Sequence, residues 1–288
     1  MDEDLKQYEA ILLSGCATLG SAHLGFLLTL QHHNRIRFLK VVSGTSIGSI
    51  IGFLFVLGIP LKDILGEYRT KQFLDLLSPA SKEDVLKNVG LATVDYILAH
   101  IIDILQNHHI DPHITFEEIQ KQRNIALIVT ATKEVDTQEL FIPVYFTPKT
   151  TPKMRVLDAI KMSISIPLLF ITPTYHGESY YDGAITCNLP YNHIESHYGI
   201  DKAFMIGHSP TVHRKFATKE PSVGRLLTKL MDYASRLISM IDDKRTVETH
   251  LGVGGALDLV TAPEYIDYYF HQAIKTTNFF ICHKRHAS

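Results

Sequence analysis

The sequence has no tryptophan, little cysteine and almost no net charge. Its three cysteines, Cys16, Cys187 and Cys282, are odd in number and show no C-x-x-C spacing. This pattern argues against a disulfide framework and a structural zinc site, and it favours a reducing compartment. The formal net charge of -2 offers no basic surface for phosphates, so we expect no nucleic acid among the partners.

Long apolar runs are also absent. The longest, residues 47–60, is shorter than the roughly 20 residues that a helix needs to cross a bilayer. The first four residues, MDED, are acidic, whereas the start of a signal peptide is basic. We therefore expect a protein without signal peptide or transmembrane helix, either cytoplasmic or peripherally bound to a membrane. A chain of 288 residues that is 45% hydrophobic can bury a large core, and we expect one domain over residues 1–288.

The chain does contain short apolar runs that alternate with helical periods. Residues 10–13 predict a buried strand, and a small-residue loop and a helix over 22–33 follow it. A second strand over 38–42 precedes a second helix-like run at 50–54. This alternation is typical of a parallel α/β sheet. Further along we predict a hairpin of strands 125–130 and 140–146, a helix over 156–162 and a strand over 203–206.

Two regions are predicted to be mainly helical. Residues 61–122 show helical periodicity with breaks at 78–79 and 111–112, and they suit a helical cap. Residues 222–288 form a C-terminal helical region behind a polar loop at 210–221, and an apolar stripe predicts a long helix over 223–241. Such a stripe suits packing against a core better than it suits a membrane surface.

Ser46 lies at the centre of the motif G-x-S-x-G, between a predicted strand and a predicted helix. The flanking glycines, Gly44 and Gly48, tolerate unusual dihedral angles and a close approach of substrate. A serine on so sharp a turn holds its hydroxyl clear of the backbone. The motif therefore predicts a serine hydrolase with Ser46 as the nucleophile.

The place of this motif in the chain excludes an ordinary α/β-hydrolase, whose elbow follows several strands rather than the second one. Three segments occur in a particular order instead: the loop SGCATLGSAHLG at 14–25, the elbow at 44–48, and the runs AIKMSISIP at 159–167 and YDGAITCNLP at 181–190. In sequence, order and spacing they resemble the patatin-like phospholipase (lipid acyl hydrolase) family over about residues 8–210.

The resemblance implies a three-layer α/β/α patatin-like fold with a mainly parallel central sheet. It also implies a Ser-Asp dyad without histidine, in which Ser46 is the nucleophile and Asp182 of Asp182-Gly183-Ala184 is the general base. Such a base must lie about 2.6–3.2 Å from the hydroxyl. The implied activity is hydrolysis of lipid esters through an acyl-enzyme, without a metal or an organic cofactor. The implied partners are the lipid substrate and, transiently, a membrane or lipid-droplet surface.

The family's glycine-rich oxyanion hole corresponds here to Gly15, Cys16 and Ala17. The chain departs from the family at this loop, because Cys16 and Ala17 replace glycines and Leu19 replaces a cation. Main-chain donors do not depend on side chains, so the hole can survive if the loop dihedral angles suit residues with a Cβ atom. The alternative is a catalytically weak patatin-like protein that binds lipid or regulates a partner.

Other residues near these motifs have simpler interpretations. We expect His23 to pack in the core and Cys16 to be a small buried residue rather than a nucleophile. Asn188 and Pro190 are expected to shape the turn after Asp182. A triad of Ser46, Asp182 and a later histidine such as His208 is a third hypothesis, which the order of the elements disfavours.

Overall fold

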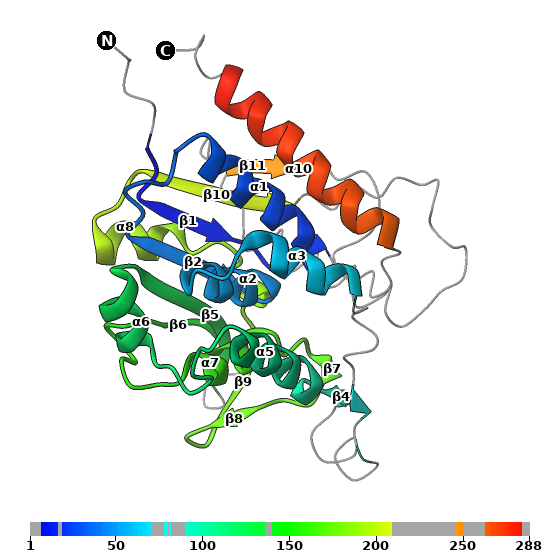
Figure 1. Ribbon diagram of the computed structural model, residues 1–288. Helices are drawn as coiled ribbons and strands as arrows, with labels where there is room; N and C mark the ends of the chain where they lie inside the picture. Colours follow the sequence, from blue (N-terminus) through cyan, green and yellow to red (C-terminus); the bar gives the residue numbers. More distant parts are fainter. Residues whose placement is uncertain are drawn as a thin grey trace.

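The computed structural model describes residues 7–16, 19–70, 78–79, 81, 90–135, 140–208, 246–249 and 263–283 (Figure 1). Its central sheet contains β1 (Ala10–Leu13), β2 (Val41–Thr45), β5 (Ala126–Val135), β6 (Leu140–Phe146), β8 (Thr174–Tyr175), β9 (Glu178–Asp182), β10 (Ala203–His208) and β11 (Thr246–Thr249). Hydrogen bonds link the strands along the path β11-β10-β1-β2-β5-β9-β8, and β6 also pairs with β5. The strands from β11 to β5 are parallel, whereas β6 and β9 run antiparallel to β5.

Helices cover both faces of this sheet. They are α1 (Gly20–His32), α2 (Ile47–Val56), α3 (Leu61–Thr70), α5 (Asp95–Asn107), α6 (Phe116–Arg123), α7 (Val156–Ser163), α8 (Tyr191–Tyr198) and α10 (Pro263–His283). Ile11 and Leu13 of β1 join a core that includes residues of α1 and α2, whereas Leu12 packs in a second core with Ile194 of α8. Successive side chains of a strand point to opposite faces, so this division shows three layers. The predicted α/β/α fold with a mainly parallel sheet is confirmed.

The long helix α10 runs beside α1 (Figure 1). A Cβ atom at Gly25 of α1 would lie 2.4 Å from the carbonyl oxygen of Phe270 and 2.9 Å from Cβ of Ala273, so the two backbones approach closely. α10 lies in the region that was predicted to be helical. The predicted loop at 210–221 and helix at 223–241 lie outside the described residues. No helix in the described ranges combines the length and apolarity needed to cross a membrane.

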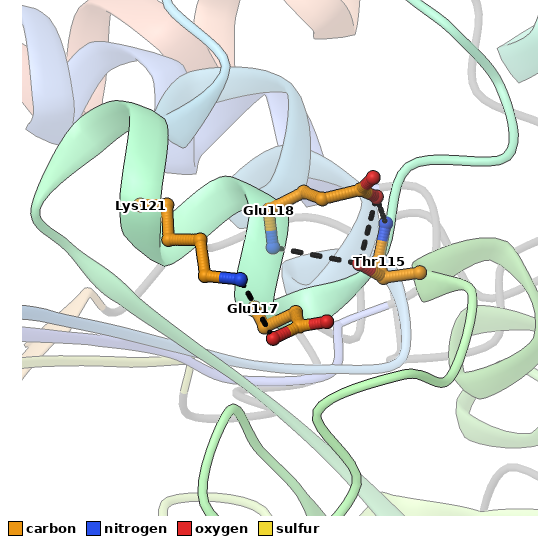
Figure 2. Close-up of polar contacts among 4 residues, drawn as sticks. All are labelled: Thr115, Glu117, Glu118 and Lys121. Atoms are coloured by element: carbon orange, nitrogen blue, oxygen red, sulfur yellow. Dashed lines mark hydrogen bonds and ion pairs between the residues drawn. The ribbon is translucent and has the colours of Figure 1, made fainter.

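Helix α6 precedes β5 in the chain. It begins with a capping box (Figure 2). The Glu118 N–H donates to Thr115 Oγ1 at 3.4 Å, and the Thr115 N–H donates back to Glu118 Oε2 at 2.8 Å. Lys121 forms an ion pair of 2.9 Å with Glu117 one turn earlier. The helix ends at Asn124, whose left-handed φ of 54° turns the chain into β5.

A small second sheet is the main departure from the predicted elements. It consists of β3 (Ser78–Pro79), β4 (Gly90–Thr93) and β7 (Leu168–Phe170). The helical prediction for 61–122 holds for α3, α5 and α6, and β3 lies at the break predicted at 78–79, but the prediction is wrong for the residues of β4. β4 has four residues and pairs with the distant β7. A strand so short carries too few positions for its period to be recognised.

Candidate active site

The pairing of β5 brings two strand ends together. Residues 129–130 of β5 pair with both β2 and β6, so β2 and β6 lie on opposite edges of β5. Residues 131–133 pair with both β6 and β9, so β9 lies on the same edge as β2. β2 and β9 therefore follow one another along a single edge of β5.

The register places the two predicted dyad residues at this junction. Thr45, the last residue of β2, pairs with Thr130. Asp182, the last residue of β9, pairs with the next residue of β5, Ala131. Ser46 follows Thr45 directly, so the sheet itself brings Ser46 beside Asp182.

Ser46 adopts the strained backbone of a sharp turn between β2 and α2. Its φ is 52° and its ψ is -126°, a conformation that a non-glycine residue rarely adopts. The turn needs glycine on both sides of the serine. A Cβ atom at Gly44 would lie 2.3 Å from the carbonyl oxygen of Gly48, and one at Gly48 would lie 2.2 Å from that of Leu13.

Hydroxyl groups hold the turn in place. The Ser46 N–H donates to Ser163 Oγ at 2.8 Å, and Ser163 Oγ donates to the carbonyl oxygen of Thr130 at 2.6 Å. Ser49 Oγ donates to the carbonyl oxygen of Ser46 at 2.6 Å. The run at 159–167 thus supports the elbow through Ser163 and ties it to β5.

Ser46 and Asp182 are in direct contact. Ser46 Oγ donates to Asp182 Oδ2 at 2.5 Å, the short end of the range for a hydroxyl and a carboxylate. The other carboxylate oxygen, Oδ1, accepts the Ala184 N–H at 2.9 Å. The main chain of Asp182 is held as well, because its N–H donates to the carbonyl oxygen of Ser165 at 2.8 Å. Both carboxylate oxygens therefore have fixed donors.

Burial controls the protonation of this carboxyl group. Asp182 is 1% exposed and Ser46 is 7% exposed. Desolvation raises the pKa of Asp182 to about 6, although the hydrogen bonds from Ser46 and Ala184 act in the opposite direction. At neutral pH the carboxylate is charged and is a stronger base than an exposed aspartate. Gly183 is required next to it, because a Cβ atom there would lie 2.3 Å from the carbonyl oxygen of Thr130.

The predicted oxyanion loop lies against Ser46. A Cβ atom at Gly15 would lie 3.0 Å from Cβ of Ser46. The Gly15 N–H donates to Asn188 Oδ1 at 2.6 Å, so in this structure it already has an acceptor. In the described part of the chain, the Cys16 N–H donates to no protein acceptor. The third predicted residue, Ala17, lies outside the described residues.

Asn188 contacts this loop through both atoms of its amide group. Its Nδ2 donates to the carbonyl oxygen of Gly15 at 3.3 Å, alongside the bond that Oδ1 accepts. The sequence suggested only that Asn188 shapes a turn. Its position six residues after Asp182, in the Asn-x-Pro end of the last motif, was the signal for a role at the site.

Cys16 and His23 are paired but do not form a nucleophile and a base. Cys16 Sγ lies 3.4 Å from His23 Nε2, which is also 2.8 Å from the carbonyl oxygen of Ser14. A carbonyl oxygen only accepts, so Nε2 carries a hydrogen and cannot take the thiol proton. Burial lowers the pKa of His23 to about 4 and raises the pKa of the Cys16 thiol. Both side chains are neutral and buried, as expected from the sequence.

Two further residues named from the sequence take no part in the hydrogen bond between Ser46 and Asp182. Leu19 is 5% exposed and belongs to the main hydrophobic core. His208 ends β10, but its side chain lies outside the described part. Ser46 donates to Asp182 directly, so no imidazole stands between them. Among the described residues, no three His, Cys, Asp or Glu side chains are grouped to hold a metal ion.

Comparison with known proteins identifies relatives of this chain. The family model described as patatin-like phospholipase matches residues 11–193. The probable lipid hydrolase 463L of Invertebrate iridescent virus 6 is 30% identical over 187 residues, which cover 64% of this chain and 62% of that protein. An uncharacterized protein of Acanthamoeba polyphaga mimivirus is 27% identical over 188 residues, which cover 64% of this chain and 60% of that protein. The chain thus spans about three fifths of the length of these two relatives.

The fold also has solved counterparts. The crystal structure of VipD from Legionella pneumophila superposes with a TM-score of 0.59 and 15% sequence identity, covering 96% of this chain and 67% of that chain. At this identity the likeness shows the fold alone.

Proposed function

Since the chain belongs to the patatin-like phospholipase family, we propose that it hydrolyses ester bonds of phospholipids or related lipids through a Ser-Asp dyad. The observation that carries this proposal is the 2.5 Å hydrogen bond from Ser46 Oγ to Asp182 Oδ2 at the strained elbow. A buried carboxylate in contact with a serine hydroxyl is the arrangement that general-base activation of a nucleophile needs. The name of the viral lipid hydrolase relative supports the same class of substrate.

In the first step, Ser46 Oγ attacks the carbonyl carbon of the ester while its proton passes to Asp182 Oδ2. The carbonyl electron pair moves onto oxygen, which forms a tetrahedral oxyanion. When the intermediate collapses, the bond to the alcohol oxygen breaks, and Asp182 gives its proton to that leaving oxygen. The products are an alcohol, such as a lysophospholipid, and an acyl group bound to Ser46.

In the second step, a water molecule attacks the acyl carbon and Asp182 accepts its proton. Collapse of the second oxyanion breaks the bond to Ser46 Oγ, which recovers the proton from Asp182. A free fatty acid leaves and the dyad is restored. The raised pKa of about 6 suits this cycle, because Asp182 must accept and then return a proton near neutral pH.

Each oxyanion needs hydrogen-bond donors, and the loop at 14–16, which packs against Ser46, supplies candidates. The Cys16 N–H is the donor of this loop that has no acceptor among the described residues. Donors that are already oriented stabilise developing charge most effectively, because they do not reorganise during the reaction. The protein would meet its substrate at a membrane or lipid-droplet surface, as a peripheral or cytoplasmic enzyme.

One observation favours a second candidate, a catalytically weak lipid-binding protein. The Gly15 N–H, which was predicted as an oxyanion donor, is engaged by Asn188, and Cys16 stands where the family has glycine. A loop with fewer free donors would stabilise the oxyanion less.

Product analysis separates the two functions. Vesicles of phosphatidylcholine, phosphatidylglycerol and triacylglycerol are incubated with the full chain, and released fatty acids and lysolipids are measured by mass spectrometry. The proposal predicts fatty acid release that Ser46→Ala abolishes without loss of vesicle binding. Binding without any release in the wild type would favour the lipid-binding function.

A further inference from the structure

The side-chain amide of Asn188 forms two hydrogen bonds with the main chain of Gly15, in the pattern that joins two antiparallel strands. Its Oδ1 accepts the Gly15 N–H at 2.6 Å and its Nδ2 donates to the Gly15 carbonyl oxygen at 3.3 Å. Only one orientation of the amide group satisfies both contacts, because the N–H requires an acceptor and the carbonyl requires a donor. The same two bonds join a hydrogen-bonded residue pair in an antiparallel sheet.

These two hydrogen bonds set the direction of the Cys16 N–H group. The chain has no cis peptide bond in its described residues, so the Gly15 carbonyl and the Cys16 N–H belong to one planar trans unit. In such a unit the C=O and the N–H point in opposite directions. Because Asn188 holds the Gly15 carbonyl on its own side, the Cys16 N–H points away from Asn188. That N–H has no protein acceptor in the part of the chain that is described.

The held peptide lies next to the reacting hydroxyl. A Cβ atom at Gly15 would be 3.0 Å from Cβ of Ser46 and 3.2 Å from Asn188 Oδ1, so Gly15 packs closely against both residues. An alanine at position 15 would press on both. The flanking residues are held separately. The Ser14 N–H donates to the carbonyl oxygen of Ile206 in β10 at 3.2 Å, and the Leu19 N–H donates to the carbonyl oxygen of Cys16 at 3.0 Å.

We propose that Asn188 is a positioning residue that fixes the Gly15-Cys16 peptide, so that the Cys16 N–H is presented to the oxyanion formed at Ser46. The Gly15 N–H then donates to Asn188 Oδ1 rather than to the oxyanion. Glycine at position 15 is needed for its closeness to Ser46, whereas position 16 needs only its main-chain donor and accepts a cysteine. This inference rests on the proposed function for the identity of the oxyanion.

The contact itself is tested without reference to activity. Amide hydrogen exchange at Gly15 is measured by NMR in the wild type, in Asn188→Ala and in Asn192→Ala. Asn192 is an exposed asparagine of α8 four residues further along, and it serves as the matched control. We expect the Gly15 amide to exchange at least about tenfold faster in Asn188→Ala and unchanged in Asn192→Ala. Equal exchange rates of the Gly15 amide in all three proteins would show that Asn188 does not hold the Gly15 N–H.

The positioning role is tested by kinetics with p-nitrophenyl butyrate. Loss of an oriented donor costs about 10²- to 10³-fold in kcat, and loosening it should cost about 10- to 100-fold while KM changes less than about threefold. A trifluoromethyl ketone, which forms an oxyanion on the serine, should lose affinity in proportion to the loss of kcat/KM. A purely structural tie would leave the inhibitor affinity and kcat near wild-type values, and that result would overturn the proposal.

Two controls keep the outcomes distinct. Asn188→Leu keeps a side chain branched at Cγ with the same number of heavy atoms and removes both hydrogen bonds, so it replaces Asn188→Ala if the smaller side chain prevents folding. If the wild type and Asn192→Ala turn over the ester but neither Asn188 variant is slower, the positioning role fails and the proposed hydrolase stands. If the folded wild type has no turnover, the proposed function fails and the positioning role fails with it, whereas the exchange result still decides the contact.

Discussion

Ser46 and Asp182 are 136 residues apart in the chain, yet their side chains share a hydrogen bond of 2.5 Å. They meet because β2 and β9 end at consecutive positions along one edge of β5. The contact is thus a property of the sheet register rather than of a flexible loop.

The activity of the wild type should fall at acid pH with an apparent pKa of about 6. Asp182 must be unprotonated to accept the Ser46 proton, and burial raises its pKa to about 6. The measurement is kcat/KM for a neutral ester between pH 4 and pH 9. An acid limb near pH 4, where an exposed aspartate titrates, would show that Asp182 is not the base.

Asp182→Asn should stabilise the folded protein at pH 7.5 but not at pH 4. The folded pKa of about 6 lies above the unfolded value of about 3.9, so the native state binds the proton more tightly. The wild type therefore loses stability as pH rises from about 4 through 6, by roughly 3 kcal/mol for two pKa units. Asp182→Asn has no titratable group at this position, so it does not lose this stability as the pH rises. Urea denaturation at the two pH values measures the difference, and equal effects at both would contradict the raised pKa.

Gly48→Ala should destabilise the protein by more than about 2 kcal/mol. Its new Cβ atom would lie 2.2 Å from the carbonyl oxygen of Leu13. The backbone at Leu13 would have to move to relieve this clash, because no flexible side chain is involved. Gly66→Ala in α3 is the matched control, because its Cβ atom would meet no other heavy atom within 4 Å. That change should stabilise the helix by about 0.5–1 kcal/mol. Thermal unfolding of both variants decides the point, and similar melting temperatures would count against the close packing of the elbow.

Leu19→Lys should destabilise the fold rather than restore a cation at the oxyanion loop. Leu19 is 5% exposed in the main core, so a lysine there would bury a charge without a partner, at a cost above about 3 kcal/mol. Leu28→Lys on α1, the helix that Leu19 precedes, is the control, since Leu28 is 40% exposed. Its effect should stay within about 0.5 kcal/mol. A stable Leu19→Lys protein with faster hydrolysis of anionic phospholipids would contradict this view.

The sequence predicted the layered fold and the residues that meet at its centre. Local periodicity was sufficient for the first strands and helices. Ser46 and Asp182 could be named because each lies in a short motif. The structure places them in contact, and their catalytic roles stay predictions until activity is measured.

The contacts that the sequence did not predict are those between distant backbones. Asn188 and Gly15 are 173 residues apart, and no pattern of residue types shows that a side-chain amide will hold a main-chain peptide. Likewise β4 exists because β7 lies beside it, not because its four residues favour a strand. Such features depend on the completed fold, so a sequence read segment by segment does not contain them.

The most direct test of the Ser-Asp dyad is the rate of covalent labelling by a fluorophosphonate, followed by peptide mass spectrometry. The account predicts one phosphonyl group on Ser46 in the wild type, none in Ser46→Ala, and labelling at least about 100-fold slower in folded Asp182→Asn. Labelling of another serine, or an undiminished rate in Asp182→Asn, would contradict it.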